Sequence, residues 1–360
     1  MKPVSDDLKA KLEGLGKPLH RYLRRDVTFG HLGFDSLIQS VLDQSLPFYL
    51  LVSKSPQATG LNLGHSVPLE LTRYFQDVFD APVVIQIGDD DKYVFTADGD
   101  IEKIAKLVKN TIKDVIAFGF KPEKTFVFIN SEYIGELYFN VCHVEKQLTQ
   151  KVIREAFGYT ESDSVGMFAL PTVKAAASFA SSFPSIFKGH NLDEVPALVI
   201  CGLDQAAFYT LASHVAPNIG KVKPAILFTE FLPSMQGLKT KMSGSEQHNS
   251  LLMTDSAADV KKKVNKYAFS GGGATLEDHK KNGGNIHIDV PYHYLRFFLE
   301  DDARLEEVRT RYSTGEMMTG EIKQAAIDAV AKHITQYQEA RKKVTDADID
   351  KVMATREVKL

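Results

Sequence analysis

Short apolar runs alternate with helical patterns through the first two thirds of the chain. Five of these runs are PFYLLV (47–52), PVVIQIG (82–88), TFVFIN (125–130), ALVICG (197–202) and KPAILF (223–228). They are rich in apolar side chains, which is typical of strands that are buried on both faces. Strands that alternate with helices predict a parallel sheet covered by helices on both faces, so the predicted fold class is α/β.

The clearest helical pattern covers residues 101–118. Its apolar positions recur with the period of a helix that has one buried stripe, at Ile101, Ile104, Leu107, Val108, Ile112, Val115 and Ile116. A second helix is predicted to begin near Ser66, directly after a polar loop. From residue 250 onward the pattern is mostly helical, with long amphipathic segments at 291–312 and 319–342.

A chain of 360 residues is too long for one core, since single cores stop growing at roughly 250–300 residues. The change of pattern near residue 245 therefore predicts a domain boundary. We expect an N-terminal segment, 1–46, that packs on or extends the core. An α/β domain at 47–245 and a helical domain at 246–360 follow it.

Composition excludes several classes of protein. The net charge is −3, from 43 basic and 46 acidic side chains, so bulk charge gives no attraction to nucleic acid or to an anionic membrane. Two cysteines are too few for a disulfide scaffold, which favours a reducing compartment. The N-terminus has no apolar signal region, and no apolar run approaches the roughly 20 residues that span a bilayer. We expect a cytoplasmic protein without a membrane segment.

Candidate chemistry lies in the loops that follow the predicted strands, because parallel sheets bind ligands at the carboxyl ends of their strands. Two common nucleotide fingerprints, G-x-G-x-x-G and G-x-x-x-x-G-K-[ST], are absent from these loops. In the loop GLNLGH, residues 60–65, Gly64 would let a ligand approach the backbone, and the following helix N-terminus favours phosphate. His65 could donate to a phosphoryl oxygen. Taken alone, a glycine and a histidine at a helix start usually have a structural role.

A second candidate is TKMSGSEQ, residues 240–247, which suits a loop that closes over a polyphosphate. Lys241 would neutralise a leaving pyrophosphate, and the hydroxyls of Ser243 and Ser245 would anchor the loop. Alone, such a segment is more often a solvated loop with one charge. Together and in this order, on either side of an α/β region, the two motifs are far more specific.

In these two motifs the sequence resembles the class I aminoacyl-tRNA synthetases, whose signatures are written HIGH and KMSKS. Further stretches are similar to the eukaryotic-type tryptophanyl-tRNA synthetases, and the resemblance covers about residues 20 to 345. These stretches are FQDVFDAPVVIQIGDDDKY (75–93), SFPSIF (182–187), LDQAAF (203–208), KVNKYAFSGGGATLEDH (263–279), GGNIHIDVPYHYL (283–295) and FFLEDD (297–302). The resemblance implies a Rossmann-like catalytic domain followed by an α-helical domain that binds the tRNA anticodon.

The implied reaction joins tryptophan and ATP to tryptophanyl-adenylate and pyrophosphate, and then transfers the aminoacyl group to tRNA, expected to be the tryptophan tRNA. Mg²⁺ would bridge the oxygens of the leaving pyrophosphate. A homodimer is expected. Phosphate contacts to tRNA could come from basic clusters of the helical domain, although acidic neighbours favour a solvated surface for about half of them. The clusters are Lys261, Lys262 and Lys263, then Arg304, Arg309 and Arg311, then Arg341, Lys342 and Lys343.

The resemblance also implies the site residues. Catalytic roles fall to His65, Lys241 and Ser243. The residues expected to bind ATP are Lys54, Asn62, Gly64, His65, Lys241, Met242 and Ser243. Those expected to bind the amino acid are Leu51, Gln86, Asp91, Gln205 and Gln236, with Asp91 suited to the α-ammonium group. No residue is predicted to bind a metal.

Three departures from the family pattern lie in this site. Asn62 stands where the first signature has its first histidine, and Leu51 stands where a tyrosine is usual. Ala206 and Ala207 replace an acid and a proline next to Gln205. These departures leave two alternatives to an active tryptophan–tRNA ligase. One is a non-aminoacylating paralogue with a binding or regulatory role, and the other is a ligase for another amino acid, such as tyrosine.

Overall fold

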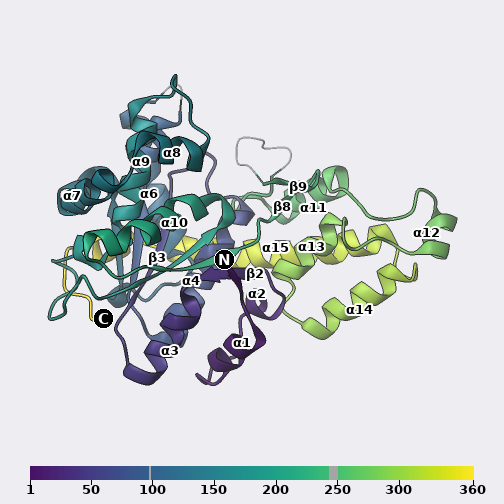
Figure 1. The fold of residues 1–360 in the computed structure, drawn as a ribbon. Coiled ribbons are helices and arrows are strands. Elements are labelled where there is room, and N and C mark those ends of the chain that lie inside the picture. Colours follow the sequence, from purple (N-terminus) through teal and green to yellow (C-terminus); the bar gives the residue numbers. More distant parts are fainter. Residues whose placement is uncertain (97–98, 243–249) are drawn as a thin grey trace. The chain divides into compact units, whose positions relative to one another are not determined.

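The computed structural model describes residues 1–96, 99–242 and 250–360 (Figure 1). Helices make up most of this part of the chain, and its strands form a large sheet and a small hairpin. Among the helices described, none is long and apolar enough to cross a membrane.

The chain divides into two compact units. The first, the sheet unit, contains Met1–Ala58, Pro68–Glu230 and Val344–Leu360. The second, the motif unit, contains Thr59–Val67 and Phe231–Lys343, and it includes the described parts of both candidate nucleotide motifs.

The sheet unit is built on a seven-stranded sheet with the order β1-β2-β7-β6-β3-β4-β5. Its strands are β1 (Lys2–Pro3), β2 (Thr28–Leu32), β3 (Tyr49–Lys54), β4 (Val83–Ile87), β5 (Thr125–Ile129), β6 (Ala197–Gly202) and β7 (Ala225–Thr229). The last five strands pair in parallel, which confirms the predicted parallel sheet. β1 and β2 add an antiparallel edge from the N-terminal segment. The apolar pattern did not predict this edge, because neither strand is a continuous apolar run.

The strand order places a switch of direction at β3. From β3 the chain proceeds to β4 and β5 on one side, and it then returns to β6 on the other side of β3. The loops after β3 and β6 therefore diverge at their carboxyl ends, where sheets of this Rossmann-like kind bind ligands.

The helices of the sheet unit follow the predicted periodicity. The predicted helix at 101–118 is α6 (Ile101–Ile116), whose N-terminus is capped by the Asp100 carboxylate. The predicted helix near Ser66 is α4 (Ser66–Phe79). The others are α1 (Asp6–Glu13), α2 (Arg21–Arg24), α3 (Phe34–Gln44), α5 (Asp89–Val94), α7 (Asn130–Gln147), α8 (Gln150–Phe157), α9 (Val165–Ala176), α10 (Ala206–Val215) and α16 (Asp346–Met353).

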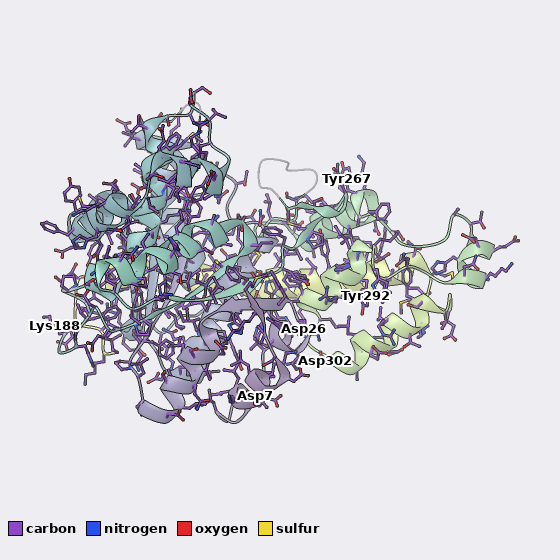
Figure 2. The ribbon with its side chains drawn as sticks, in the orientation of Figure 1. Asp7, Asp26, Lys188, Tyr267, Tyr292 and Asp302 are labelled. Atoms are coloured by element: carbon purple, nitrogen blue, oxygen red, sulfur yellow. The ribbon has the colours of Figure 1, made fainter. Side chains whose placement is uncertain are left out.

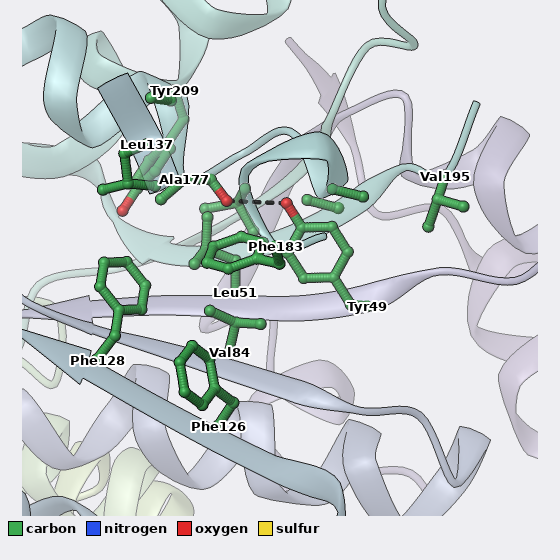
Figure 3. Packing of buried hydrophobic residues seen from close by; sticks show 14 of the residues in the cluster. Tyr49, Leu51, Val84, Phe126, Phe128, Leu137, Ala177, Phe183, Val195 and Tyr209 are labelled. Atoms are coloured by element: carbon green, nitrogen blue, oxygen red, sulfur yellow. Dashed lines mark hydrogen bonds between the residues drawn. The ribbon is translucent and has the colours of Figure 1, made fainter. Parts of the chain in front are cut away.

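The core of the sheet unit is aromatic and dense (Figure 3). Leu51 of β3 and Val84 of β4 are fully buried in it, next to each other in strand register. The Phe183 and Phe128 rings lie 5.5 Å apart between centroids. Burying each such side chain contributes roughly 1.5–3 kcal/mol. A shift of strand register by one residue would turn Leu51 or Val84 to the opposite face of the sheet. The core therefore fixes the strand ends that carry the candidate site.

The motif unit is mainly helical. Its elements are the 3-10 helix η1 (Leu63–His65), the hairpin β8 (Pro233–Ser234) and β9 (Gly237–Lys241), and the helices α11 (Ala257–Tyr267), α12 (Leu276–Asn282), α13 (Val290–Phe298), α14 (Asp302–Ser313) and α15 (Thr319–Lys343). The amphipathic segment at 291–312 is divided into α13 and α14, because Asp301 caps the N-terminus of α14 through the Arg304 N–H. The segment at 319–342 forms α15, as predicted.

Main-chain hydrogen bonds explain why the first motif belongs to the motif unit. The Leu63 N–H donates to the Leu251 carbonyl over 2.8 Å, and the Met253 N–H donates to the Leu61 carbonyl over 2.8 Å. Residues far apart in sequence are thereby joined as neighbouring backbone segments. The pattern of apolar runs did not predict this pairing.

The C-terminal segment belongs to the sheet unit, although the prediction placed it with the helical domain. Ile349 and Val352 of α16 are buried, and the Arg356 guanidinium donates to the carbonyl of Thr125 over 3.1 Å. The compact units therefore do not coincide with the predicted boundaries. The division into a catalytic and an anticodon-binding domain describes function, and it stays a prediction.

Candidate active site

Polar residues follow three parallel strands of the sheet unit. Lys54 is the last residue of β3, Asp91 lies in α5 directly after β4, and Gln205 ends the 3-10 helix η4 (Leu203–Gln205) directly after β6. Parallel strands end at the same edge of a sheet, so their loops share this edge. The structure thus places these three predicted residues where an α/β sheet binds ligands.

A buried lysine that the sequence analysis did not single out joins two of these residues. Lys174 lies in α9, and its side chain is 3% exposed. Its ammonium nitrogen is 3.0 Å from Asp91 Oδ2 and donates to Gln205 Oε1 over 3.0 Å. The same nitrogen lies 4.5 Å from the centre of the Phe208 ring. A carboxylate, an amide oxygen and an aromatic face together surround one ammonium group.

The Asp91 carboxylate has a second donor in the Ser55 hydroxyl, which lies just after β3. Gly88 allows this carboxylate to come close to the end of β4. A Cβ atom built at Gly88 would lie 3.2 Å from Asp91 Cβ, which is tighter than most contacts of real Cβ atoms. Asp91 therefore lies close to the end of β4, in the first turn of α5.

A second polar chain runs inward from this loop. The Asn130 amide donates to Asp90 Oδ1 over 2.7 Å, and the Gln86 amide donates to Asn130 Oδ1 over 2.9 Å. Burial raises the pKa of Asp90, and the Asn130 hydrogen bond acts against this shift. Because the ionised carboxylate only accepts hydrogen bonds, it orients the Asn130 amide, and Asn130 in turn orients Gln86. Gln86 Oε1 is then left as an acceptor.

Three buried polar atoms near the ends of β3 and β4 have no hydrogen-bond partner within the described residues: Gln86 Oε1, Ser53 Oγ and Tyr209 Oη. Ser53 and Gln86 are adjacent in strand register. Burial raises the pKa of the Tyr209 phenol, and the nearby Ser53 hydroxyl acts in the opposite direction. The Ser53 and Tyr209 hydroxyls lie close enough to interact with each other, which leaves Gln86 Oε1 as the unsatisfied atom. Buried polar groups normally find a partner, so this unsatisfied oxygen indicates a site for a polar ligand.

Leu51 borders this polar group from the apolar side. Side chains alternate along a strand, so Leu51 and Ser53 share one face of β3, and Val84 and Gln86 share the matching face of β4. Along both strands the buried surface changes from apolar to polar toward the carboxyl end. Leu51 itself is part of the dense core.

The first motif, in the motif unit, is held by a reciprocal cap. Asn62 Oδ1 accepts from the His65 backbone N–H over 3.1 Å, and the Asn62 backbone N–H donates to His65 Nδ1 over 3.1 Å. In the neutral imidazole the proton therefore sits on Nε2, which makes Nε2 a donor. Asn62 is 1% exposed, so its side chain serves the fold of the motif.

The same asparagine reaches the second motif. Its amide nitrogen donates to the Met242 carbonyl over 3.4 Å, and Met242 is buried. Lys241 is the last residue of β9, whereas its side chain and Ser243 lie outside the described part of the structure. Gln236 is exposed in the turn between β8 and β9, where its backbone N–H donates to Ser234 Oγ over 3.3 Å. The motif unit thus brings the described backbone of the two motifs together.

Comparisons with known proteins agree along nearly the whole chain. Residues 185–335 match the family described as tRNA synthetases class I (W and Y). The chain is 41% identical to the cytoplasmic tryptophan–tRNA ligase of Rattus norvegicus over 346 residues, which cover 95% of this chain and 71% of the rat protein. The chain belongs to the tryptophan–tRNA ligase family. The corresponding Schizosaccharomyces pombe ligase is 40% identical over 339 residues, which cover 94% of this chain and 85% of that protein.

Solved structures of this family have the same fold. The tryptophanyl-tRNA synthetase from Giardia lamblia superposes with a TM-score of 0.92 at 33% identity, covering 98% of this chain and 93% of that one. The Plasmodium falciparum enzyme gives a TM-score of 0.89 at 34% identity, covering 98% and 94%. The expected class I fold, with its parallel sheet and helical C-terminal region, is thereby confirmed. The family uses ATP, in agreement with the two nucleotide motifs.

Two polar residues of the candidate site, Lys174 and Asn130, were missed from the sequence. Lys174 is the one charged residue in the mostly apolar stretch FALPTVKAAASFA (168–180), and a lysine there was a usable signal. Asn130 comes directly after a predicted strand, at the edge where ligands bind, and position alone could have marked it.

Proposed function

We propose that this chain activates tryptophan with ATP to tryptophanyl-adenylate and pyrophosphate, and transfers the aminoacyl group to the tryptophan tRNA. The observation that carries the proposal is the 41% identity to a tryptophan–tRNA ligase over 95% of the chain. Activation is an attack by the amino-acid carboxylate on the α-phosphorus of ATP. Such a step needs alignment and charge stabilisation more than covalent help from the protein.

ATP would be held by the two signature motifs of the motif unit, and the resemblance also assigns Lys54 to ATP. The cap between Asn62 and His65 supports this role, because it orients the imidazole with a donor at Nε2. Lys241 would neutralise the leaving pyrophosphate. The other contacts to ATP would come from Gly64, Met242 and Ser243.

Mg²⁺ would enter as a complex with the ATP phosphates. Among the described residues, no group of three His, Cys, Asp or Glu side chains could hold a metal ion. Phosphate oxygens and water are the ligands that Mg²⁺ prefers. The ion would add positive charge where negative charge leaves, and no side chain is assigned to it.

The indole ring would enter between the core and the polar group at the strand ends. Gln86 Oε1 is buried without a partner in the described chain, so it can accept the indole N–H that Leu51 cannot accept. A buried, unmatched N–H would cost about 1–3 kcal/mol. Asp91 and Gln205 would receive the α-ammonium group. Gln236 is the fifth residue that the resemblance assigns to the amino acid.

The tRNA would meet exposed lysines of the motif unit. Lys261 and Lys262 of α11 are exposed, as are Lys342 and Lys343 at the end of α15. The arginines of α14 offer less, because each forms an ion pair with Glu306 or Glu307 of the same helix. Binding through the lysines would weaken steeply with salt.

We propose a homodimer, to be checked by light scattering. We also propose a cytoplasmic location, because the rat and fission-yeast relatives are named as cytoplasmic enzymes.

Amino-acid-dependent ATP–pyrophosphate exchange tests the activation step on purified protein, with all twenty amino acids measured separately. We expect exchange with tryptophan. Lys241→Ala should lower the exchange rate by about 10²–10³, as removal of one transition-state donor does, while the affinity for ATP changes far less. Lys188→Ala is the matched control, since Lys188 is an exposed lysine of the sheet unit (Figure 2).

Each other outcome of the exchange assay has a defined meaning. Exchange with a different amino acid would indicate that Leu51 has changed the amino-acid specificity of the enzyme. Silence with all twenty amino acids, from protein that still binds ATP, would overturn the proposal in favour of a non-aminoacylating paralogue. Equal losses of rate and ATP affinity in Lys241→Ala would assign Lys241 to simple binding.

A further inference from the structure

The surroundings of Lys174 are those of an ammonium-binding site. An ammonium group has three N–H donors and no acceptor. Here it has the Asp91 carboxylate at 3.0 Å, the Gln205 amide oxygen at 3.0 Å and the Phe208 ring at 4.5 Å. Aromatic faces attract cations, and the attraction is stronger when the cation is removed from water. The site therefore satisfies this cation completely from within the chain.

The substrate of the proposed reaction carries the same chemical group. A free amino acid presents an α-ammonium, and the proposed function assigns its recognition to Asp91 and Gln205. Lys174 already uses Asp91 Oδ2 and Gln205 Oε1. The side chains of Lys174 and Asp91 are 3% and 16% exposed, so water screens this pair only weakly.

We propose that Lys174 is a specificity-determining residue that occupies the α-ammonium subsite of the amino-acid pocket. The substrate ammonium must displace the lysine from Asp91 and Gln205 before it can bind. A ligand that has the carboxylate but lacks the ammonium does not have to do so. The inference rests on the proposed function for the identity of the amino acid, whereas the occupied subsite is defined by the contacts of Lys174.

The contacts of Lys174 join segments that follow two different parallel strands through a residue of a third element. Asp91 follows β4, Gln205 follows β6, and Lys174 lies in α9. A lysine that served only the fold would not need to end at the ligand-binding edge. Its position indicates control of what the pocket accepts.

Three ligands separate the charges. Tryptophan carries both the ammonium and the carboxylate, indole-3-propionate lacks the ammonium, and tryptamine lacks the carboxylate. Dissociation constants would be measured by calorimetry on the full-length wild type, Lys174→Gln and Lys174→Met. Both substitutions remove the ammonium, and glutamine keeps a donor for Asp91.

The deciding quantity is the affinity for tryptophan relative to that for indole-3-propionate. We expect this ratio to rise at least about tenfold in either variant, the order expected when a charge-assisted hydrogen bond becomes available to the ligand. The affinity for tryptamine should rise in the variants together with the affinity for tryptophan. An unchanged or lower ratio would overturn the proposal, because a purely structural lysine would affect all three ligands alike.

Should neither variant fold, the wild type alone decides. Competition by Lys174 predicts that wild-type protein binds tryptophan less than about tenfold more tightly than indole-3-propionate, and a larger preference would overturn it. Calorimetry measures binding without a chemical step, so its result does not depend on whether the exchange assay shows activity. If no amino acid supports exchange but the tryptophan to indole-3-propionate affinity ratio rises in the variants, the ligase proposal is wrong and the occupied ammonium subsite stands. If tryptophan supports exchange but the affinity ratio does not change in the variants, the ligase proposal stands and the subsite proposal is wrong.

Discussion

Asn62 in the motif unit and Lys174 in the sheet unit are both buried polar residues, and they differ in what surrounds them. Asn62 occupies a signature position, and its hydrogen bonds go to His65 and to the Met242 carbonyl. Lys174 belongs to no signature, and its polar contacts are Asp91 and Gln205, which are proposed to bind the substrate. One residue serves the fold of its motif, and the other fills a subsite.

The difference shows that departure from a signature is a poor measure of lost function. What counts is whether the new side chain is satisfied by the fold or uses groups that the ligand needs. Asn is a favourable N-cap residue, so the Asn62 substitution keeps the helix start that positions His65. A buried ammonium in the pocket changes the charge that a substrate meets. The following predictions, from the largest expected effect to the smallest, test this contrast.

Asp91→Ala should destabilise the protein most. It leaves the Lys174 ammonium buried without its carboxylate, which typically costs about 3–5 kcal/mol. Urea unfolding measures the loss, and Asp91→Ala combined with Lys174→Met should recover much of it. A double variant as unstable as the single one would show that the ion pair is not the source.

Leu51→Tyr should cost about 1–3 kcal/mol of stability, because the added ring and hydroxyl overpack a dense core. It should nevertheless tighten tryptophan binding, since the phenol supplies an acceptor next to the polar group. Leu51→Phe is the matched control, with the same ring and no hydroxyl. Equal tryptophan affinities of the Tyr and Phe variants would count against placing Leu51 beside the indole.

Asn62→Ala should lower the free energy of unfolding by about 0.5–2 kcal/mol through loss of the N-cap. Asn62→Asp keeps the capping oxygen and loses only the donor to Met242, so it should lie closer to the wild type. Thermal unfolding of the two variants, with the activity of each, checks this order. An Ala variant as stable as the wild type would mean that Asn62 is kept for the ligand instead.

Asp90→Asn should have the smallest effect, visible as a change in pH dependence. Burial raises the folded-state pKa of Asp90 above the ordinary value of 3.8, so the folded chain holds this proton more readily than the unfolded chain. The associated stability is present at low pH and is lost as the pH rises through the folded pKa. Unfolding at pH 4 and pH 7 should therefore show the wild type losing stability relative to the variant. A constant difference would contradict this cause.

The fold was predictable because its signals are continuous. Five apolar runs gave the parallel strands, and the stripe along 101–118 gave α6. The pairing of Leu63 with Leu251 and the docking of α16 depend on contacts between distant segments, and no local pattern records them.

Candidate site residues could be named from the sequence where a motif or a resemblance marked them, as at His65, Asp91 and Gln205, and their roles stay predictions. Lys174 was missed because the apolar pattern of α9 predicts a buried helix and says nothing of which polar atoms one buried lysine will reach. Conversely, the loss of histidine at position 62 looked like damage from the sequence. Only the hydrogen bonds of Asn62 show that the motif keeps its shape.

Tryptophan-dependent pyrophosphate exchange, measured side by side on the wild type, Asn62→His and Lys174→Gln, tests the contrast most directly. We expect exchange by all three proteins. The KM for tryptophan should lie within about threefold of the wild type in Asn62→His and be at least about tenfold lower in Lys174→Gln. A much higher exchange rate in Asn62→His, together with an unchanged or higher KM for tryptophan in Lys174→Gln, would contradict this contrast between the two residues.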